Sequence, residues 1–332
     1  MGRCALTVGG ASRTLLLSLL TCAIALGTAT GARVQRPIRG MWVRGEQVPL
    51  SPRGGDALLD LCASRRIELL FVAVPELMPG SYEKWRRFLT RAHQRGVRVH
   101  ALAGEARWGL VQGTAEASKK PQRGPMLAAG RSLALNHIGQ VIAYNRSASP
   151  TERFDGVQHD VPVWDTERYA SAGDSPARAT ILANYVEQLW GCALFLRSLG
   201  EQVLFGTRIP ARLDDAVTWG KPGQYKEATL PLSQQVIRTA HYVAIMAAAD
   251  TTDGVLAAVA DDVQFAGNVG TRAFVGVSTA PVGTTGSSAT FADDGLAAMD
   301  QVLAEVTTRL ATEPGFAGIA IDSYATYESL RP

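Results

Sequence analysis

Short apolar runs alternate with longer stretches of helical periodicity along most of the chain. Residues 69–74 form a continuous apolar run, as expected for a strand that is buried on both faces. Between such runs, apolar residues recur every three or four positions, as in Tyr185, Leu189 and Cys192. The pattern predicts eight strands, at residues 41–44, 67–74, 97–103, 154–161, 202–207, 242–248, 272–278 and 316–322.

Eight strands that alternate with helices predict a parallel sheet covered by helices. A closed (β/α)8 TIM barrel fits this order best, because such barrels often use 250 or so residues as one domain. The alternative is an open, doubly wound sheet. That fold usually carries a glycine-rich phosphate loop after an early strand, and the sequence has no such loop.

The amino-terminal 32 residues have the layout of a secretory signal peptide. Arg3 and Arg13 precede an apolar run at 15–26, and small residues fill 27–32. We therefore expect residues 1–32 to be cleaved and residues 33–332 to form one barrel domain of a secreted or periplasmic protein. Cys22 offers a lipoprotein alternative, but Thr21 stands where a small residue is usual and apolar residues continue beyond it.

Composition and charge indicate which kinds of binding partner the protein is expected to have. The chain is 46% hydrophobic and 19% charged, which indicates a folded core. Its formal charge is +3, and the predicted cleavage removes two arginines and no acid. A nearly neutral chain does not favour nucleic acid as a partner. The run at 15–26 is shorter than the ~20 residues of a membrane-spanning helix, so we expect no membrane span.

Two cysteines, Cys62 and Cys192, remain after the predicted cleavage. They fall in helical patterns far apart in sequence, which favours buried free thiols over a disulfide. The five histidines do not form a metal-binding spacing, and we predict neither a metal nor another cofactor.

Candidate chemistry lies at the carboxyl ends of the predicted strands, where TIM barrels place their working residues. The fourth strand is the richest. Because side chains alternate along a strand, Gln158, Asp160 and Pro162 share one face and His159 lies on the other. If the first face lines the lumen, Asp160 points into the mouth of the barrel, where a carboxylate must be hydrogen-bonded or used.

The stretch 154–162, Phe-Asp-Gly-Val-Gln-His-Asp-Val-Pro, resembles the fourth-strand motif Asp-Gly-x-Asp-x-Asp-x-Glu of chitinase-type glycoside hydrolases. Asp155 and Gly156 match its opening and Asp160 matches its second inner Asp. Gln158 replaces the first inner Asp, and Pro162 stands where the catalytic Glu belongs. The stretches 242–246 and 315–321 are similar to the sixth and eighth strands of such barrels. The resemblance implies a carbohydrate substrate or ligand and a role for Asp160 in orienting the substrate or stabilising a cationic intermediate.

Glycoside hydrolysis needs two acidic groups, and proline supplies none. A second carboxylate must then come from another strand or loop. The candidates are Glu105, Asp250 and Asp322, together with Asp165 and Glu167 on the loop after the fourth strand.

Other strand-end residues could form the walls of a sugar-binding site. Indole rings at strand ends stack on sugar rings, although they also plug barrel mouths. The predicted substrate-binding residues are Trp42, Arg44, Trp108, His159, Trp164, Arg208 and Tyr324.

Two functions from different classes remain open. The chain is a secreted glycoside-hydrolase-like enzyme in which Asp160 and another carboxylate share the acid and base roles. Alternatively, it is a lectin-like barrel that binds a glycan without turnover. The sequence does not determine the sugar or the oligomeric state.

Overall fold

The computed structural model describes residues 36–45, 47–74, 76–110, 125–211, 213–219, 228–283 and 289–331. Every described residue belongs to the unit Val34–Pro332. The predicted signal peptide at 1–32, and Cys22 with it, lies outside the described residues. The boundary between signal and barrel therefore stays a prediction.

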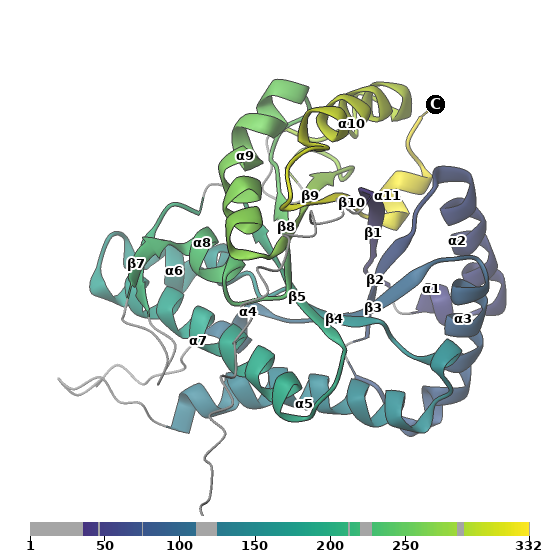
Figure 1. The fold of residues 1–332 in the computed structure, drawn as a ribbon, viewed down its shortest axis with the longest axis horizontal. Helices are drawn as coiled ribbons and strands as arrows, with labels where there is room; N and C mark the ends of the chain where they lie inside the picture. Colours follow the sequence, from purple (N-terminus) through teal and green to yellow (C-terminus); the bar gives the residue numbers. More distant parts are fainter. Residues whose placement is uncertain are drawn as a thin grey trace, which may run out of the picture. The chain divides into compact units, whose positions relative to one another are not determined.

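Eight parallel strands close into a barrel, which confirms the predicted (β/α)8 TIM barrel (Figure 1). Around the barrel the order is β1-β10-β9-β8-β5-β4-β3-β2, so each barrel strand pairs with the barrel strands before and after it in the chain, and β1 closes the ring against β10. The barrel strands are β1 (Ile38–Val43), β2 (Leu69–Ala73), β3 (Arg98–Ala103), β4 (Gly156–His159), β5 (Leu204–Pro210), β8 (Tyr242–Met246), β9 (Arg272–Ser278) and β10 (Phe316–Asp322).

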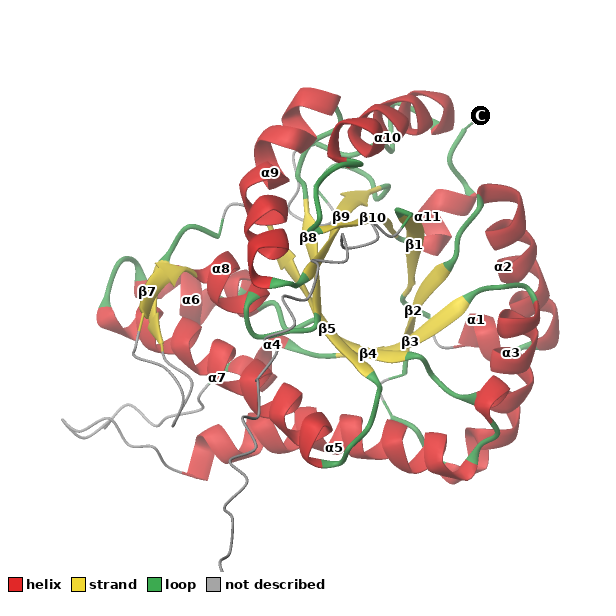
Figure 2. Ribbon diagram, in the orientation of Figure 1, coloured by secondary structure: helices red, strands yellow, loops and turns green. Residues whose placement is uncertain are grey.

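Helices surround the barrel, as Figure 2 shows in red. The longer ones are α2 (Pro52–Arg65), α3 (Tyr82–Gln94), α5 (Pro125–Ser147), α7 (Pro176–Ser198), α9 (Thr252–Val269) and α10 (Leu296–Leu310). Short ones are α1 (Gln47–Leu50), α4 (Ala106–Gly109), α6 (Glu167–Ala172), α8 (Leu232–Ile237), α11 (Tyr324–Glu328) and the 3₁₀ turns η1 (Pro79–Ser81), η2 (Pro150–Glu152) and η3 (Val163–Asp165). None of the described helices is long and apolar enough to span a membrane.

An antiparallel hairpin, β6 (Ala216–Trp219) with β7 (Ala228–Pro231), interrupts the connection from β5 to β8. The sequence pattern did not predict it. Four residues are too few for a clear alternation of apolar and polar positions, so periodicity gave no signal there.

Apolar and aromatic side chains fill the lower lumen. Phe71 and Tyr242 stack with their ring centroids 6.1 Å apart, and the hydroxyl of Tyr242 and Nδ1 of His100 are 2.7 Å apart. Glycines make room for these rings. A Cβ at Gly206 would overlap the ring of Tyr242, and one at Gly156 would lie 2.7 Å from the ring of His100. The lumen is therefore a packed core below the mouth, not a channel.

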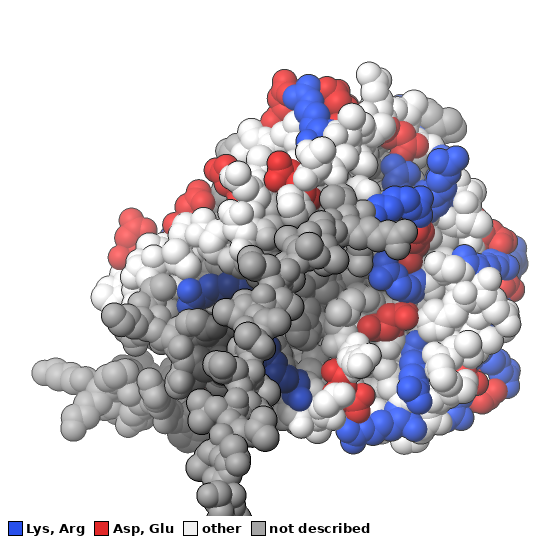
Figure 3. All heavy atoms as spheres, viewed as in Figure 1, with Lys and Arg blue, Asp and Glu red and all other residues white. Residues whose placement is uncertain are grey.

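A second apolar layer joins the strands to the helices. Cys62 of α2 and Cys192 of α7 are buried in it, and neither forms a disulfide, which agrees with the prediction. Over the described residues on the face seen in Figure 3, basic and acidic side chains are interspersed, without an extended area of one sign.

Candidate functional site at the barrel mouth

Four charged side chains meet at the carboxyl ends of the barrel strands. We call Arg44, Asp160, Arg208 and Asp322 the mouth cluster. Arg44 and Asp160 directly follow β1 and β4, while Arg208 and Asp322 belong to β5 and β10. Because β1 neighbours β10 and β4 neighbours β5, with two strands between the pairs on either side, the cluster bridges opposite walls of the barrel.

Each carboxylate of the cluster contacts both guanidinium groups. Arg44 donates from Nε and Nη2 to the two oxygens of Asp322 at 2.9 and 2.8 Å, and from Nη1 to Oδ2 of Asp160 at 3.1 Å. Nη1 of Arg208 lies 3.3 Å from Oδ2 of Asp160, and its Nη2 lies 3.5 Å from Oδ2 of Asp322. The four side chains thus form a ring of alternating charge whose formal charges cancel.

The carboxylates lie deeper than the arginines. The side chains of Asp160 and Asp322 are 10% and 8% exposed, whereas that of Arg44 is 42% exposed. Burial alone would raise the pKa of Asp322, but the hydrogen bonds and charge of Arg44, with the charge of Arg208, hold that pKa below its ordinary value. Asp322 therefore stays ionised over the pH range in which a glycosidase acid must carry a proton.

Trp42 and Gln158 form the floor beneath the cluster. The indole Nε1–H of Trp42 donates to Oε1 of Gln158 at 2.6 Å, and both side chains are fully buried. The guanidinium carbon of Arg208 lies 6.0 Å from the Trp42 ring centroid, within cation–π range. Trp42, predicted as a stacking platform, instead has its ring below Arg208 with no exposed surface.

Asp165 ends η3, the turn that follows Pro162, and the charges of Arg208 and Asp160 act on its carboxyl group. It is exposed. Partial burial raises the pKa of Asp165, the charge of Arg208 lowers it and the charge of Asp160 raises it further, with a net upward shift. An upward shift of the pKa is the direction that a general acid requires.

His159 points away from the mouth, as the alternation along β4 requires. It is fully buried, with Nε2 3.2 Å from Nδ1 of His137 and its ring edge-to-face with Trp108 and Phe205. Burial, with the charge of His137, lowers the pKa of His159 well below its ordinary value. A neutral histidine enclosed between strands and helices has a packing role in this structure.

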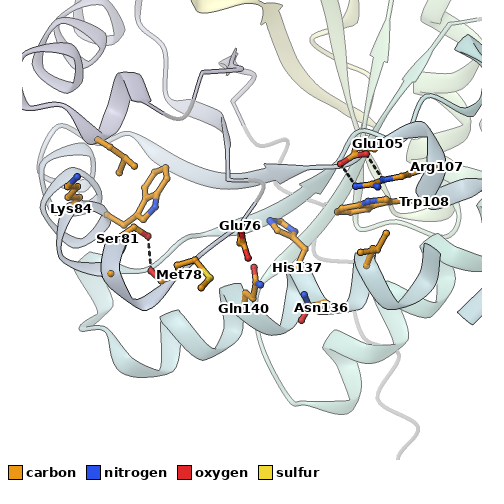
Figure 4. A pocket seen from close by; sticks show the side chains of 14 residues that line it. Glu76, Met78, Ser81, Lys84, Glu105, Arg107, Trp108, Asn136, His137 and Gln140 are labelled. Atoms are coloured by element: carbon orange, nitrogen blue, oxygen red, sulfur yellow. Dashed lines mark hydrogen bonds and ion pairs between the residues drawn. The ribbon is translucent and has the colours of Figure 1, made fainter. Parts of the chain in front are cut away.

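Glu105 and Trp108 lie next to the mouth rather than in it. Glu105 forms an ion pair with Arg107, in which Oε2 lies 2.6 Å from Nε. Trp108 is largely buried, with 8% of its surface exposed. Both line a groove of about 730 Å³ along α3 and α5, shown in Figure 4. Glu105 has no contact with the mouth cluster among the described ion pairs.

The three remaining predicted residues make no described contact with the mouth cluster. Asp250 is half-buried in the loop between β8 and α9 and has no ion-pair partner among the described residues. Trp164 packs edge-to-face on Tyr185, with ring centroids 5.6 Å apart. Tyr324 is largely buried in α11. No cluster of three or more side chains that could hold a metal ion occurs in the described part of the chain.

The chain is similar to several proteins of known structure. No protein-family model matches it, and no curated protein matches its sequence. Among solved structures, it is similar to a glycoside hydrolase family 18 N-acetylglucosaminidase from Paenibacillus barengoltzii (14% identity, 88% of this chain and 96% of that one, TM-score 0.49). It is also similar to a chitinase from Chromobacterium violaceum (11%, 88% and 97%, TM-score 0.42) and to a D-psicose 3-epimerase (12%, 86% and 85%, TM-score 0.49).

All three identities are below 25% and all three TM-scores are below 0.5, so these likenesses carry no argument about the chemistry of this chain. The barrel itself is established by the strand pairing of this chain. Any assignment of function therefore rests on the residues at the mouth.

Proposed function

We propose that the protein binds a carbohydrate at the barrel mouth without hydrolysing it. The observation that carries the proposal is the mouth cluster, in which both inward carboxylates are engaged by the same two guanidinium groups. A pair of carboxylates in this position would otherwise suggest a glycosidase.

The distance between the carboxylates does not exclude hydrolysis, but their environment opposes it. Asp160 and Asp322 both bind the guanidinium of Arg44, which keeps them within the ~9.5 Å that paired glycosidase carboxylates span. The space between them holds Arg44 and Arg208 rather than a glycosidic bond. The lowered pKa of Asp322 disfavours a proton donor there, and Pro162 stands at the position of the acid in the motif that the fourth strand resembles.

The same arrangement favours binding. A guanidinium has five N–H groups, and the hydrogen bonds of Arg44 to the described residues use three of them. The remaining two belong to a side chain that is 42% exposed and held in a fixed orientation by two carboxylates. Fixed donors recognise the hydroxyl and ring oxygens of a sugar without a large entropic cost.

One observation favours the alternative of a working enzyme. The pKa of Asp165 is raised and the charge of Asp160 contributes to that shift, as expected for a general acid that works with a second carboxylate. In that reading, Asp165 protonates the leaving oxygen and Asp160 supports the developing positive charge. Loss of glycan cleavage in Asp165→Asn with retained binding would support it.

Secretion is part of the proposal. It is supported by the order of Arg3, Arg13, the apolar run at 15–26 and the small residues at 27–32, and a polymeric glycan is a ligand met outside the cell. Amino-terminal sequencing of the mature protein tests it.

Co-sedimentation with insoluble chitin, cellulose and other polysaccharides tests the binding proposal. Wild-type protein should sediment with at least one of them, and Arg44→Gln should weaken that binding about tenfold, which corresponds to one lost charge-assisted hydrogen bond. Arg36→Gln is the matched control, because it removes an arginine that pairs with Glu68 elsewhere on the surface. Binding that is unchanged in Arg44→Gln would contradict the proposal, as would a wild type that binds none of these polysaccharides.

A further inference from the structure

The groove along α3 and α5 is separate from the mouth cluster. Its volume is about 730 Å³, within the ~300–1,000 Å³ of small-molecule sites, and it lies at the carboxyl ends of β2 and β3. Figure 4 shows Asn136, His137 and Gln140 reaching into it from α5, opposite residues of the η1 turn and α3. No residue of the mouth cluster lines it.

Polar groups in the groove are held in place. Oε1 of Gln140 accepts the backbone N–H of Leu77 at 3.1 Å, so its amide nitrogen remains as a donor of fixed orientation. Glu105 is fixed by Arg107. Carboxamide and carboxylate groups each offer two adjacent polar atoms, which match two neighbouring hydroxyl groups.

An aromatic wall accompanies these polar groups. Trp108 is packed against the rings of His159 and His137, with ring centroids 5.2 and 6.3 Å apart, and it exposes 8% of its surface. A rigid indole beside hydrogen-bonding groups gives a site both the apolar and the polar contacts that a sugar ring needs.

The charges of the groove favour a ligand without net charge. Glu76 and Lys84 both line it, and neither has an ion-pair partner among the residues that the structure describes. One unpaired charge of each sign, together with the neutralised pair of Glu105 and Arg107, leaves no net charge to attract an ion. Charged groups of both signs can nevertheless bind hydroxyls as acceptors and donors.

From these observations we infer that the groove is a second saccharide-binding site, for a neutral sugar unit. The ligand class rests on the proposed function together with the groove's own lining. The groove and the mouth cluster adjoin each other at the end of β3. A Cβ at Gly104 would overlap the carbonyl of Asp160, and Glu105, which lines the groove, follows Gly104 directly. The end of β3 therefore separates the groove from the mouth, and in this inference a single oligosaccharide chain occupies both.

Calorimetric titration with chitohexaose, cellohexaose and the corresponding disaccharides tests this inference. The variants are Asn136→Ala and Gln140→Glu, of which the second keeps an oxygen to accept the Leu77 N–H and removes the amide donor. Each should weaken hexasaccharide binding about tenfold, and Arg36→Gln should not change it. Disaccharide binding at the mouth should be weakened by Arg44→Gln and unaffected by the two groove variants.

The outcomes separate the two proposals. Hexasaccharide affinity unchanged in both groove variants, but reduced in Arg44→Gln, would overturn the second site and leave the mouth proposal standing. Weakening in the groove variants with no effect of Arg44→Gln would support the second site and contradict the mouth proposal. A wild type that binds none of these oligosaccharides would overturn the second site.

Discussion

Arg44 and Asp322 are joined by two parallel hydrogen bonds, from Nε at 2.9 Å and from Nη2 at 2.8 Å. The pair closes the barrel at the seam between β1 and β10, where Trp42 is in register with Asp322. A bidentate pair fixes the plane of the guanidinium as well as its position. The orientation of Arg44 at the mouth is therefore set by the last strand of the barrel.

Removal of the Asp322 charge should destabilise the fold. Asp322→Asn leaves Arg44 and Arg208 with one carboxylate in a site where Asp322 is 8% exposed. We expect a loss of about 2–4 kcal/mol in the free energy of unfolding, less than the largest values for buried pairs because Arg44 is partly exposed. Urea unfolding measures it.

Arg36→Gln is the control for that measurement. Arg36 also contacts both carboxylate oxygens of its partner, Glu68, but its side chain is 75% exposed. The expected loss is below about 1 kcal/mol. Equal losses of unfolding free energy in Asp322→Asn and Arg36→Gln would show that burial does not strengthen the ion pairs of the mouth cluster.

Gly206→Ala should disrupt the lumen. The new methyl group would overlap the ring of Tyr242, whose neighbours Phe71 and Phe274 leave it little room to move. Overpacking of this kind costs about 1–3 kcal/mol. Thermal unfolding of Gly206→Ala should therefore begin at a lower temperature than that of the wild type.

Two further variants make the Gly206 measurement decisive. Gly139→Ala in α5, where a Cβ meets nothing within 4 Å, should leave stability unchanged or raise it. Tyr242→Leu removes the ring atoms that the added methyl group would meet, so Gly206→Ala should cost less in that background than in the wild type. Strict additivity of the two changes would contradict the steric account.

Acidification should weaken the fold through its buried histidines. Burial lowers the pKa of His100 to about 3 and that of His137 to about 4, and it lowers the pKa of His159 and His241 as well. In the unfolded chain these groups titrate near pH 6.5, so below that pH the unfolded chain binds protons that the fold excludes. Each fully buried histidine should remove up to about 1.4 kcal/mol per pH unit.

His93 acts in the opposite direction. Its hydrogen bond with Asp155 raises the pKa of His93, so its contribution is complete below the unfolded pKa and is lost as the pH rises through the folded value. The pKa is lowered in four histidines and raised in one. We therefore expect the free energy of unfolding to decrease from pH 7 to pH 5. Urea midpoints at these two pH values test it, and a higher midpoint at pH 5 would refute it.

The strands could be predicted from the sequence because their signal is local. Continuous apolar runs such as Leu69–Ala73 identify strands covered on both sides, and the alternation in β4 correctly directs Gln158 and Asp160 inward and His159 outward. Both inferences use only neighbouring residues.

The partners of Asp160 could not be predicted, because they depend on closure of the barrel. Arg44 and Asp160 are 116 residues apart in the chain and follow strands on opposite walls, so only closure of the barrel brings them together. The groove could not be predicted either, because its polar residues have no distinctive sequence signal. Asn136 and Gln140 are four residues apart on α5, and a polar pair at that spacing is typical of any solvent-facing helix.

Release of reducing ends is the most direct test of the central claim that the mouth binds glycan without turnover. Wild-type protein is incubated at length with the polysaccharide it binds, between about pH 4 and pH 8, and the products are measured by mass spectrometry. Binding without turnover predicts no release of reducing ends above a protein-free blank. Release that scales with protein concentration and disappears in Asp165→Asn or Asp160→Asn would contradict it.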